Sequence, residues 1–135
     1  MAKTWRQKLE GGQPAHVEIL SKPYGGAPEG AKMLVATPRL IDDYIRNIPA
    51  GQSRTVAQMR LDLAVTYGAD ISCPISTSIF TRIAAEAALE EIESGKLLSE
   101  VTPFWRVIDE KSPIANKLSC GADMIRTQRA REAIV

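Results

Sequence analysis

Residues 76–95 carry the longest helical pattern in the sequence. Ser76 or Thr77 supplies a hydroxyl N-cap, and Gly95 ends the segment. Between them, apolar side chains recur at the spacing of one helix face: Ile79, Phe80, Ile83, Ala84, Ala87, Ala88 and Ile92. With 135 residues, the chain is long enough to bury a hydrophobic core without metal or disulfide support. The sequence therefore predicts one domain in which this helix is the longest element.

Two shorter helices are predicted before it. Thr37 followed by Pro38 is typical of a helix start, because the hydroxyl caps the helix and proline needs no hydrogen-bond acceptor at the first helical position. Thr55 and Gln58 match a capping box, which marks a second start. The predicted helices run from Pro38 to Ile48 and from Val56 to about Gly68.

The remaining segments are less regular. Residues 1–32 are predicted to form an N-terminal arm, with a helix over 4–10, a strand over 16–20 and a loop over 22–30. Residues 33–135 are predicted to form the domain, which continues with a strand over 101–108 interrupted by Pro103, a loop over 109–113 and a helix over 123–133. This order predicts a mainly α fold with a small β element, a winged helix-turn-helix. The connection over 69–75 is longer than is usual in that motif.

Charge and composition narrow the classes of function. The chain has 17 basic and 16 acidic residues, and this net charge of +1 excludes a strongly basic coat protein. Cys73, Cys120 and the single His16 lack the paired spacing of a zinc site or a disulfide framework, so we expect no metal and no cofactor. No signal peptide or membrane span is apparent, which predicts a cytoplasmic protein.

One segment resembles a known family. Thr102-Pro103-Phe104-Trp105-Arg106-Val107-Ile108 is similar to the Pro-Cys-His-Arg-Val-Ile active-site pattern of the O6-alkylguanine-DNA alkyltransferases. Ile48-Pro49-Ala50-Gly51 resembles the Ile-Pro-x-Gly of that family, and Thr81-Arg82-Ile83-Ala84 lies where the family has an arginine opening its recognition helix. Gly121, with Gln128-Arg129 beyond it, resembles the segment after the wing. The resemblance covers about residues 38 to 133.

The two reactive positions of the family pattern differ in this chain. Phe104 stands in place of the alkyl-accepting cysteine and Trp105 in place of its histidine, so neither position offers a nucleophile or a proton acceptor. The resemblance therefore implies a non-catalytic alkyltransferase-like protein, which would bind alkylated DNA for other repair proteins. Phe104, Trp105 and Arg106 form the equivalent of the base pocket. Their rings are expected either to stack on an extruded base or to fill the pocket.

The resemblance and the charges also indicate DNA-contacting residues. Arg82, with Thr81 beside it, would lie at the start of the recognition helix, although Arg82 could equally pair with Glu86 one turn later. Arg54 precedes a helix, and Lys111 and Lys117 flank the predicted wing. Residues 61–101 hold two basic and seven acidic residues, net −5, which opposes simple DNA binding by this helix.

Three functions remain open from the sequence. The first is a non-catalytic protein that binds duplex DNA, alkylated or not. The second is a winged-helix module for a protein partner, with Phe104 and Trp105 as a hot spot if they are exposed. The third is an enzyme with unrecognised chemistry, for which one histidine and no nucleotide-binding loop leave few groups.

Overall fold

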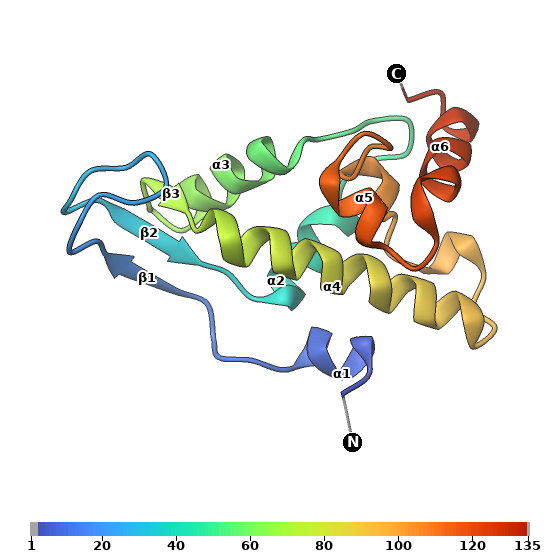
Figure 1. Cartoon of the computed structure of the whole chain (residues 1–135), viewed down its shortest axis with the longest axis horizontal. Helices are drawn as coiled ribbons and strands as arrows, with labels where there is room; N and C mark the ends of the chain where they lie inside the picture. The colour runs from blue at the N-terminus through green and yellow to red at the C-terminus, as the bar shows by residue number, and fades with distance from the viewer. Residues whose placement is uncertain (1–2, 135) are drawn as a thin grey trace.

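Helix α4 (Pro74–Glu93) is the longest element, and the other helices pack around it (Figure 1). The computed structural model describes residues 3–134 of the chain. Before α4, the chain forms α1 (Trp5–Glu10), β1 (His16–Ile19), β2 (Lys32–Val35), α2 (Pro38–Arg46), α3 (Val56–Thr66) and β3 (Ile71–Ser72). After it come the 3-10 helices η1 (Leu98–Glu100) and η2 (Phe104–Arg106), then α5 (Pro113–Lys117) and α6 (Gly121–Arg131). The prediction of a mainly α fold with a small β element is confirmed.

The helix starts follow the capping signals of the sequence. The Thr37 hydroxyl accepts a hydrogen bond from the Leu40 amide and Pro38 is the first residue of α2, both as predicted. Thr55 and Gln58 form the predicted capping box at α3. These local signals placed α2 and α3 to within about two residues.

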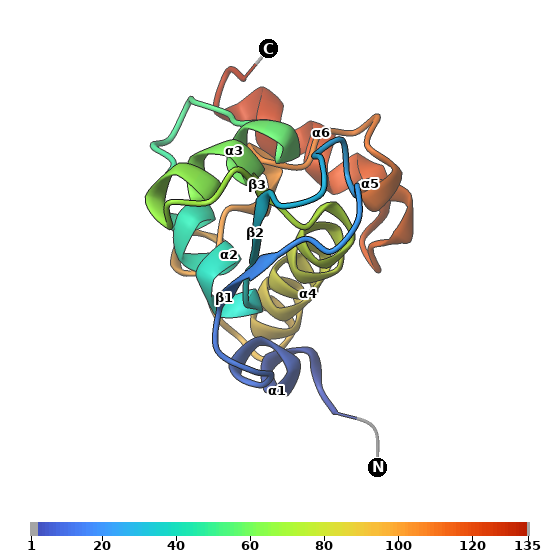
Figure 2. The same cartoon turned by 90° about the vertical axis from the view of Figure 1, so that its left-hand side faces the viewer.

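The sheet has the order β1-β2-β3. β1 pairs antiparallel with β2, with His16 opposite Val35 and Ile19 opposite Lys32. β3 pairs parallel with β2, so the connection between α3 and α4 belongs to the sheet. Viewed from the hairpin end, β2 lies between α2 and α3 on one side and α4 on the other (Figure 2).

The strand predicted over residues 101–108 does not form, and this prediction is wrong. The segment forms η2 and turns, in which the Arg106 amide donates to the Pro103 carbonyl and the Ile108 amide to the Phe104 carbonyl. Proline has no amide to offer a sheet, and local turns satisfy the buried backbone here instead. The predicted wing therefore has no strand. The last predicted helix, over 123–133, corresponds to α6, which begins and ends two residues earlier, and α5 was not predicted.

Helix α4 begins three to four residues earlier than predicted, because its N-cap is Cys73 rather than Ser76 or Thr77. Pro74 is its first residue, and Thr77, predicted as a cap, lies inside the helix with its hydroxyl donating to the Cys73 carbonyl. Arg82 consequently lies near the middle of α4. The prediction that Arg82 opens the recognition helix is wrong, because proline at the first position fixes the start upstream.

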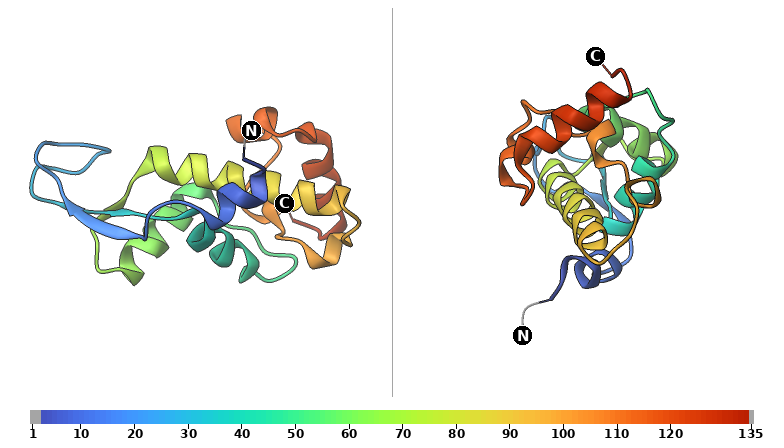
Figure 3. Two further views of the ribbon diagram at one scale, coloured as in Figure 1. Left: turned by 90° about the horizontal axis from the view of Figure 1, so that it is seen from below. Right: turned by 90° about the vertical axis from the view of Figure 1, so that its right-hand side faces the viewer.

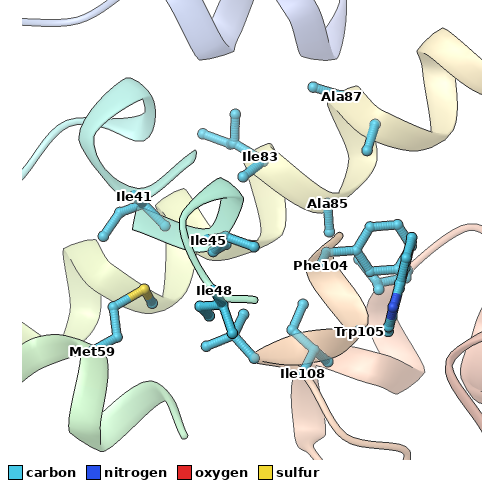
Figure 4. Packing of buried hydrophobic residues seen from close by; sticks show 14 of the residues in the cluster. Ile41, Ile45, Ile48, Met59, Ile83, Ala85, Ala87, Phe104, Trp105 and Ile108 are labelled. Atoms are coloured by element: carbon cyan, nitrogen blue, oxygen red, sulfur yellow. The ribbon is translucent and has the colours of Figure 1, made fainter. Parts of the chain in front are cut away.

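The larger of two hydrophobic clusters joins α4 to the segments on either side of it. Ile41 and Ile45 of α2 and Met59 of α3 are fully buried against it (Figure 4). Small alanines line the buried face of α4, which allows neighbouring helices to approach closely: Ala84, Ala85, Ala87 and Ala88. Leu9 of α1 belongs to the same core, so the segment predicted as an arm contributes to it.

Helix α1 is anchored to α4 by one carboxylate. Glu90 accepts hydrogen bonds from the backbone amides of Trp5, at 3.0 Å, and Arg6, at 3.2 Å. These amides have no acceptor within α1, and a negative charge at a helix N-terminus is favourable. The helix lies beside α4 in the view from below (Figure 3).

Replacing Glu90 with alanine should release α1. We expect the loss of two charge-assisted hydrogen bonds to cost about 1–3 kcal/mol locally, so trypsin should cleave faster after Arg6 and Lys8. Glu93→Ala is the matched control, because Glu93 is exposed on the same helix. Equal cleavage rates in the two variants would show that Glu90 does not hold α1.

Candidate functional site

The aromatic pair of the alkyltransferase-like segment lies inside the protein. Phe104 is completely buried and Trp105 is 4% exposed. Their rings meet edge to face, with centroids 5.3 Å apart (Figure 4). Both rings are packed inside the protein, so neither presents a face on which an extruded base could stack. They are also not an exposed hot spot for a protein partner.

Arg106 is also held in place, by a carboxylate from the end of α6. Its guanidinium donates to both oxygens of Glu132, at 2.8 and 2.9 Å, and to the Ile48 carbonyl at 2.8 Å. Trp105 donates its indole N–H to Glu132 at 2.7 Å, and the Gly51 amide donates at 3.0 Å. This cluster joins η2, the loop after α2 and the end of α6.

The surroundings of Glu132 favour its charged form. Burial alone would raise its pKa, but the hydrogen bonds from Arg106, Gly51 and Trp105 lower the pKa from 4.5 to about 2. Both oxygens of the carboxylate therefore accept hydrogen bonds from these partners. A cavity of about 700 Å³ lies beside Trp105 and is lined by Arg46, Arg106 and Arg131. Glu132 neutralises Arg106 and Asp42 pairs with Arg46, whereas no ion pair engages Arg131 within the described residues.

Arg82 lies in a different environment, on the face that α4 turns toward α1 and α5. Its guanidinium carbon is 5.4 Å from the centroid of the Trp5 ring, and one terminal nitrogen is 4.0 Å from a Glu86 oxygen. Its Nε is buried and has no hydrogen-bond partner among the described residues. Thr81 beside it is fully buried and donates to the Thr77 carbonyl, so it offers no side-chain group to a ligand.

A cavity of about 300 Å³ brings Arg82 together with Lys117 of α5. The other lining residues come from α1 and α4 and from the first turn of α5: Trp5, Lys8, Ser78, Ile79, Ile83 and Ile114. The floor is apolar, while the charged groups that line it are cationic. Lys8 also lies over the Trp5 ring, with 4.2 Å between its Nζ and the ring centroid.

Lys8 and Trp5 were not predicted as site residues. The sequence does indicate a helix over 4–10, but it carries no local signal that this helix packs against α4. Tertiary contacts of α1 with α4 bring the two side chains to Arg82: the hydrogen bonds to Glu90, the ion pair of Arg6 with Glu91 and the burial of Leu9.

Most acidic residues of α4 make contacts within the protein. Glu86 is buried and accepts from the amide and hydroxyl of Ser119. Glu90 holds α1, and Glu91 lies 3.5 Å from Arg6 and 3.7 Å from Lys96. Nearby cations offset the charge of Glu86 and Glu91, whereas Glu90, whose hydrogen-bond donors are neutral amides, and the exposed Glu93 keep a negative charge that opposes DNA binding.

The other predicted contacts lie apart from this cavity. The Arg54 side chain donates to the Ser53 carbonyl and to Gln52, and its amide donates to the Arg106 carbonyl. Lys111 lines a separate hollow beside α6. The five predicted DNA contacts are therefore not one surface, and only Arg82 and Lys117 share a cavity.

Metal binding and membrane insertion find no support in residues 3–134. No group of three or more histidine, cysteine or acidic side chains there is arranged to hold a metal ion. Cys73 and Cys120 are free thiols. None of the described helices has the length and apolar character to cross a bilayer.

Comparisons with known proteins assign this chain to no family. No family model, curated protein or solved structure matches this chain.

Proposed function

We propose that this protein binds duplex DNA without catalysis, through the face where α1, α4 and α5 meet. The observation that carries the proposal is the convergence of Lys8, Arg82 and Lys117 around one cavity. No ion pair engages Lys8 or Lys117 within the described residues, and Arg82 meets only a buried glutamate at 4.0 Å. Cations that are free of carboxylates are available to phosphates, which supply much of the affinity for DNA.

In this proposal, α3 and α4 are the two helices of a helix-turn-helix unit. Their connection contains β3, which explains its length. The wing is not part of the proposal, because the residues predicted to form it contain η2 and α5. The alkyl-accepting chemistry of the resembling family is also excluded from the proposal, since Phe104 and Trp105 fill the equivalent position.

The test is a binding titration with two duplexes that differ only in one O6-methylguanine, at several salt concentrations. We expect salt-dependent binding of equal affinity to both duplexes. Arg82→Gln with Lys117→Gln should lower the salt slope by about two, because each lost phosphate contact lowers it by about one. Lys22→Gln, an exposed lysine outside the cavity, is the control. Absence of salt-dependent binding, or a double variant that behaves like the control, would refute the proposal.

A second candidate function is docking of a protein partner at the same face. Ile79 lines the cavity and is 53% exposed, and Ile75 one turn earlier is 60% exposed. Exposed aliphatic side chains contribute little to phosphate binding but much to protein interfaces. Ile79→Ser separates the two functions, since it should leave the affinity for DNA unchanged and weaken a protein complex.

A further inference from the structure

Strand β1 forms an open edge of the sheet. In the order β1-β2-β3 it has a neighbour on one side only, and no described element lies beyond it (Figure 1). All four of its residues are exposed, and Ile19 is 73% exposed. An unpaired edge offers rows of backbone donors and acceptors to another strand.

The backbone pattern shows which residues face outward. The Leu20 amide donates to the Ala31 carbonyl, so the backbone groups of Leu20 point toward β2. Backbone direction alternates along a strand, so those of Glu18 and His16 also point toward β2. Val17 and Ile19 lie between these positions and direct their amides and carbonyls to the open edge. A strand that adds to β1 must therefore pair with these two residues.

We propose that β1 pairs antiparallel with β1 of a second copy of this chain, centred on Val17. In this register the two Val17 residues form a hydrogen-bonded pair, and His16 of each copy lies opposite Glu18 of the other. Ala15 of each copy lies opposite Ile19 of the other.

Charge selects this register over its neighbour. Antiparallel pairing about Glu18 would place two glutamates directly opposite each other, which is unfavourable. Pairing about Val17 instead places an imidazole opposite each carboxylate. Pro14, which has no amide, then falls opposite Leu20, a position whose backbone groups face away from the new strand, so it interrupts no hydrogen bond.

The two faces of the extended sheet would be chemically distinct. Val17 lies opposite Leu34 of β2, so Val17 and Ile19 are on the face that continues the main core. His16 and Glu18 are on the other face, where they already lie 2.9 Å apart within one chain. The second copy would add apolar contacts on one face and opposite charges on the other.

Such an interface is small, so the dimer should be weak and should depend on concentration. The test is sedimentation equilibrium of the full chain between about 10 µM and 1 mM, at pH 6 where the imidazole is largely protonated. We expect the unmodified protein to dimerise within this range. Each of His16→Glu and Glu18→Lys should weaken the dimer roughly tenfold, because two symmetric attractive pairs become repulsive.

The double variant with both substitutions distinguishes this register from a general effect of charge. It places the introduced carboxylate at position 16 opposite the introduced ammonium group at position 18 of the other copy. We therefore expect its dimer constant to return to near that of the unmodified protein. Glu29→Lys, an exposed change of the same charge outside β1, should have no effect. The proposal is refuted if the chain stays monomeric throughout, if the single variants dimerise normally, or if the double variant does not recover.

Discussion

Replacing Phe104 with alanine should lower the free energy of unfolding by about 3–5 kcal/mol. Phe104 is completely buried, and its ring meets Trp105 and the alanine face of α4. Removing it leaves a void that close-packed neighbours cannot fill without moving. Urea denaturation followed by tryptophan fluorescence measures the change.

Leu97→Ala is the control for this prediction. Leu97 is 66% exposed, so its truncation should change the free energy of unfolding by less than about 0.5 kcal/mol. A loss below about 1 kcal/mol for Phe104→Ala would mean that the segment resembling the alkyltransferase site is not part of the core. In that case, the position could still open to a base.

Replacing Glu132 with glutamine should lower the stability at pH 7 by about 2–3 kcal/mol, because Arg106 then lies partly buried without a counter-charge. The effect should depend on pH. The pKa of Glu132 is about 2 in the folded protein and 4.5 without these contacts. Its stabilising contribution is therefore complete above about pH 4.5 and is lost as the pH falls toward 2, with an upper limit of about 3 kcal/mol.

The measurement is urea unfolding of the unmodified protein and of Glu132→Gln at pH 7, 4 and 3. The difference between the two proteins should shrink as the pH falls, and taking the difference cancels the carboxylates that they share. Glu110→Gln is the control, because its partner Arg126 is more than half exposed and such surface pairs contribute little. A difference that is absent, or constant over this pH range, would contradict the assigned role of Glu132.

The local elements of this fold were predictable because their signals are local. Thr37, Thr55 and Gln58 act within one helical turn and form the expected caps, and Pro38 is the first residue of α2 as expected. The segment over 101–108 was not predictable in this way. A run of apolar residues at this length fits a strand or a buried turn equally well, and only the lack of a neighbouring strand decides between them.

The candidate site, too, could be predicted only in part. Arg82 was predicted as a residue at the start of the recognition helix, and Lys117 as a residue beside a wing that does not form. Trp5 and Lys8 were missed because contacts between segments far apart in the sequence, such as that of Trp5 with Glu90, bring them to the site. Thr81 was predicted from its neighbour in sequence, and the helix turns its side chain inward.

The residues of this chain that match the Arg-Val-Ile part of the family pattern stabilise its fold. Arg106 fixes the end of α6 through Glu132, and Val107 and Ile108 are buried in the core. These three residues therefore have reasons to be present that do not involve alkyl transfer.

The attachment of α1 by Glu90 couples the cavity to a local folding equilibrium. Trp5 and Lys8 reach Arg82 only while α1 is docked, so the apparent affinity of any ligand there scales with the docked fraction of molecules. By the same linkage, a ligand that touches these side chains protects α1 from opening. The contacts that dock α1, which include two backbone hydrogen bonds to Glu90 and the burial of Leu9, thus help to set the occupancy of a surface formed from three separate segments of the chain.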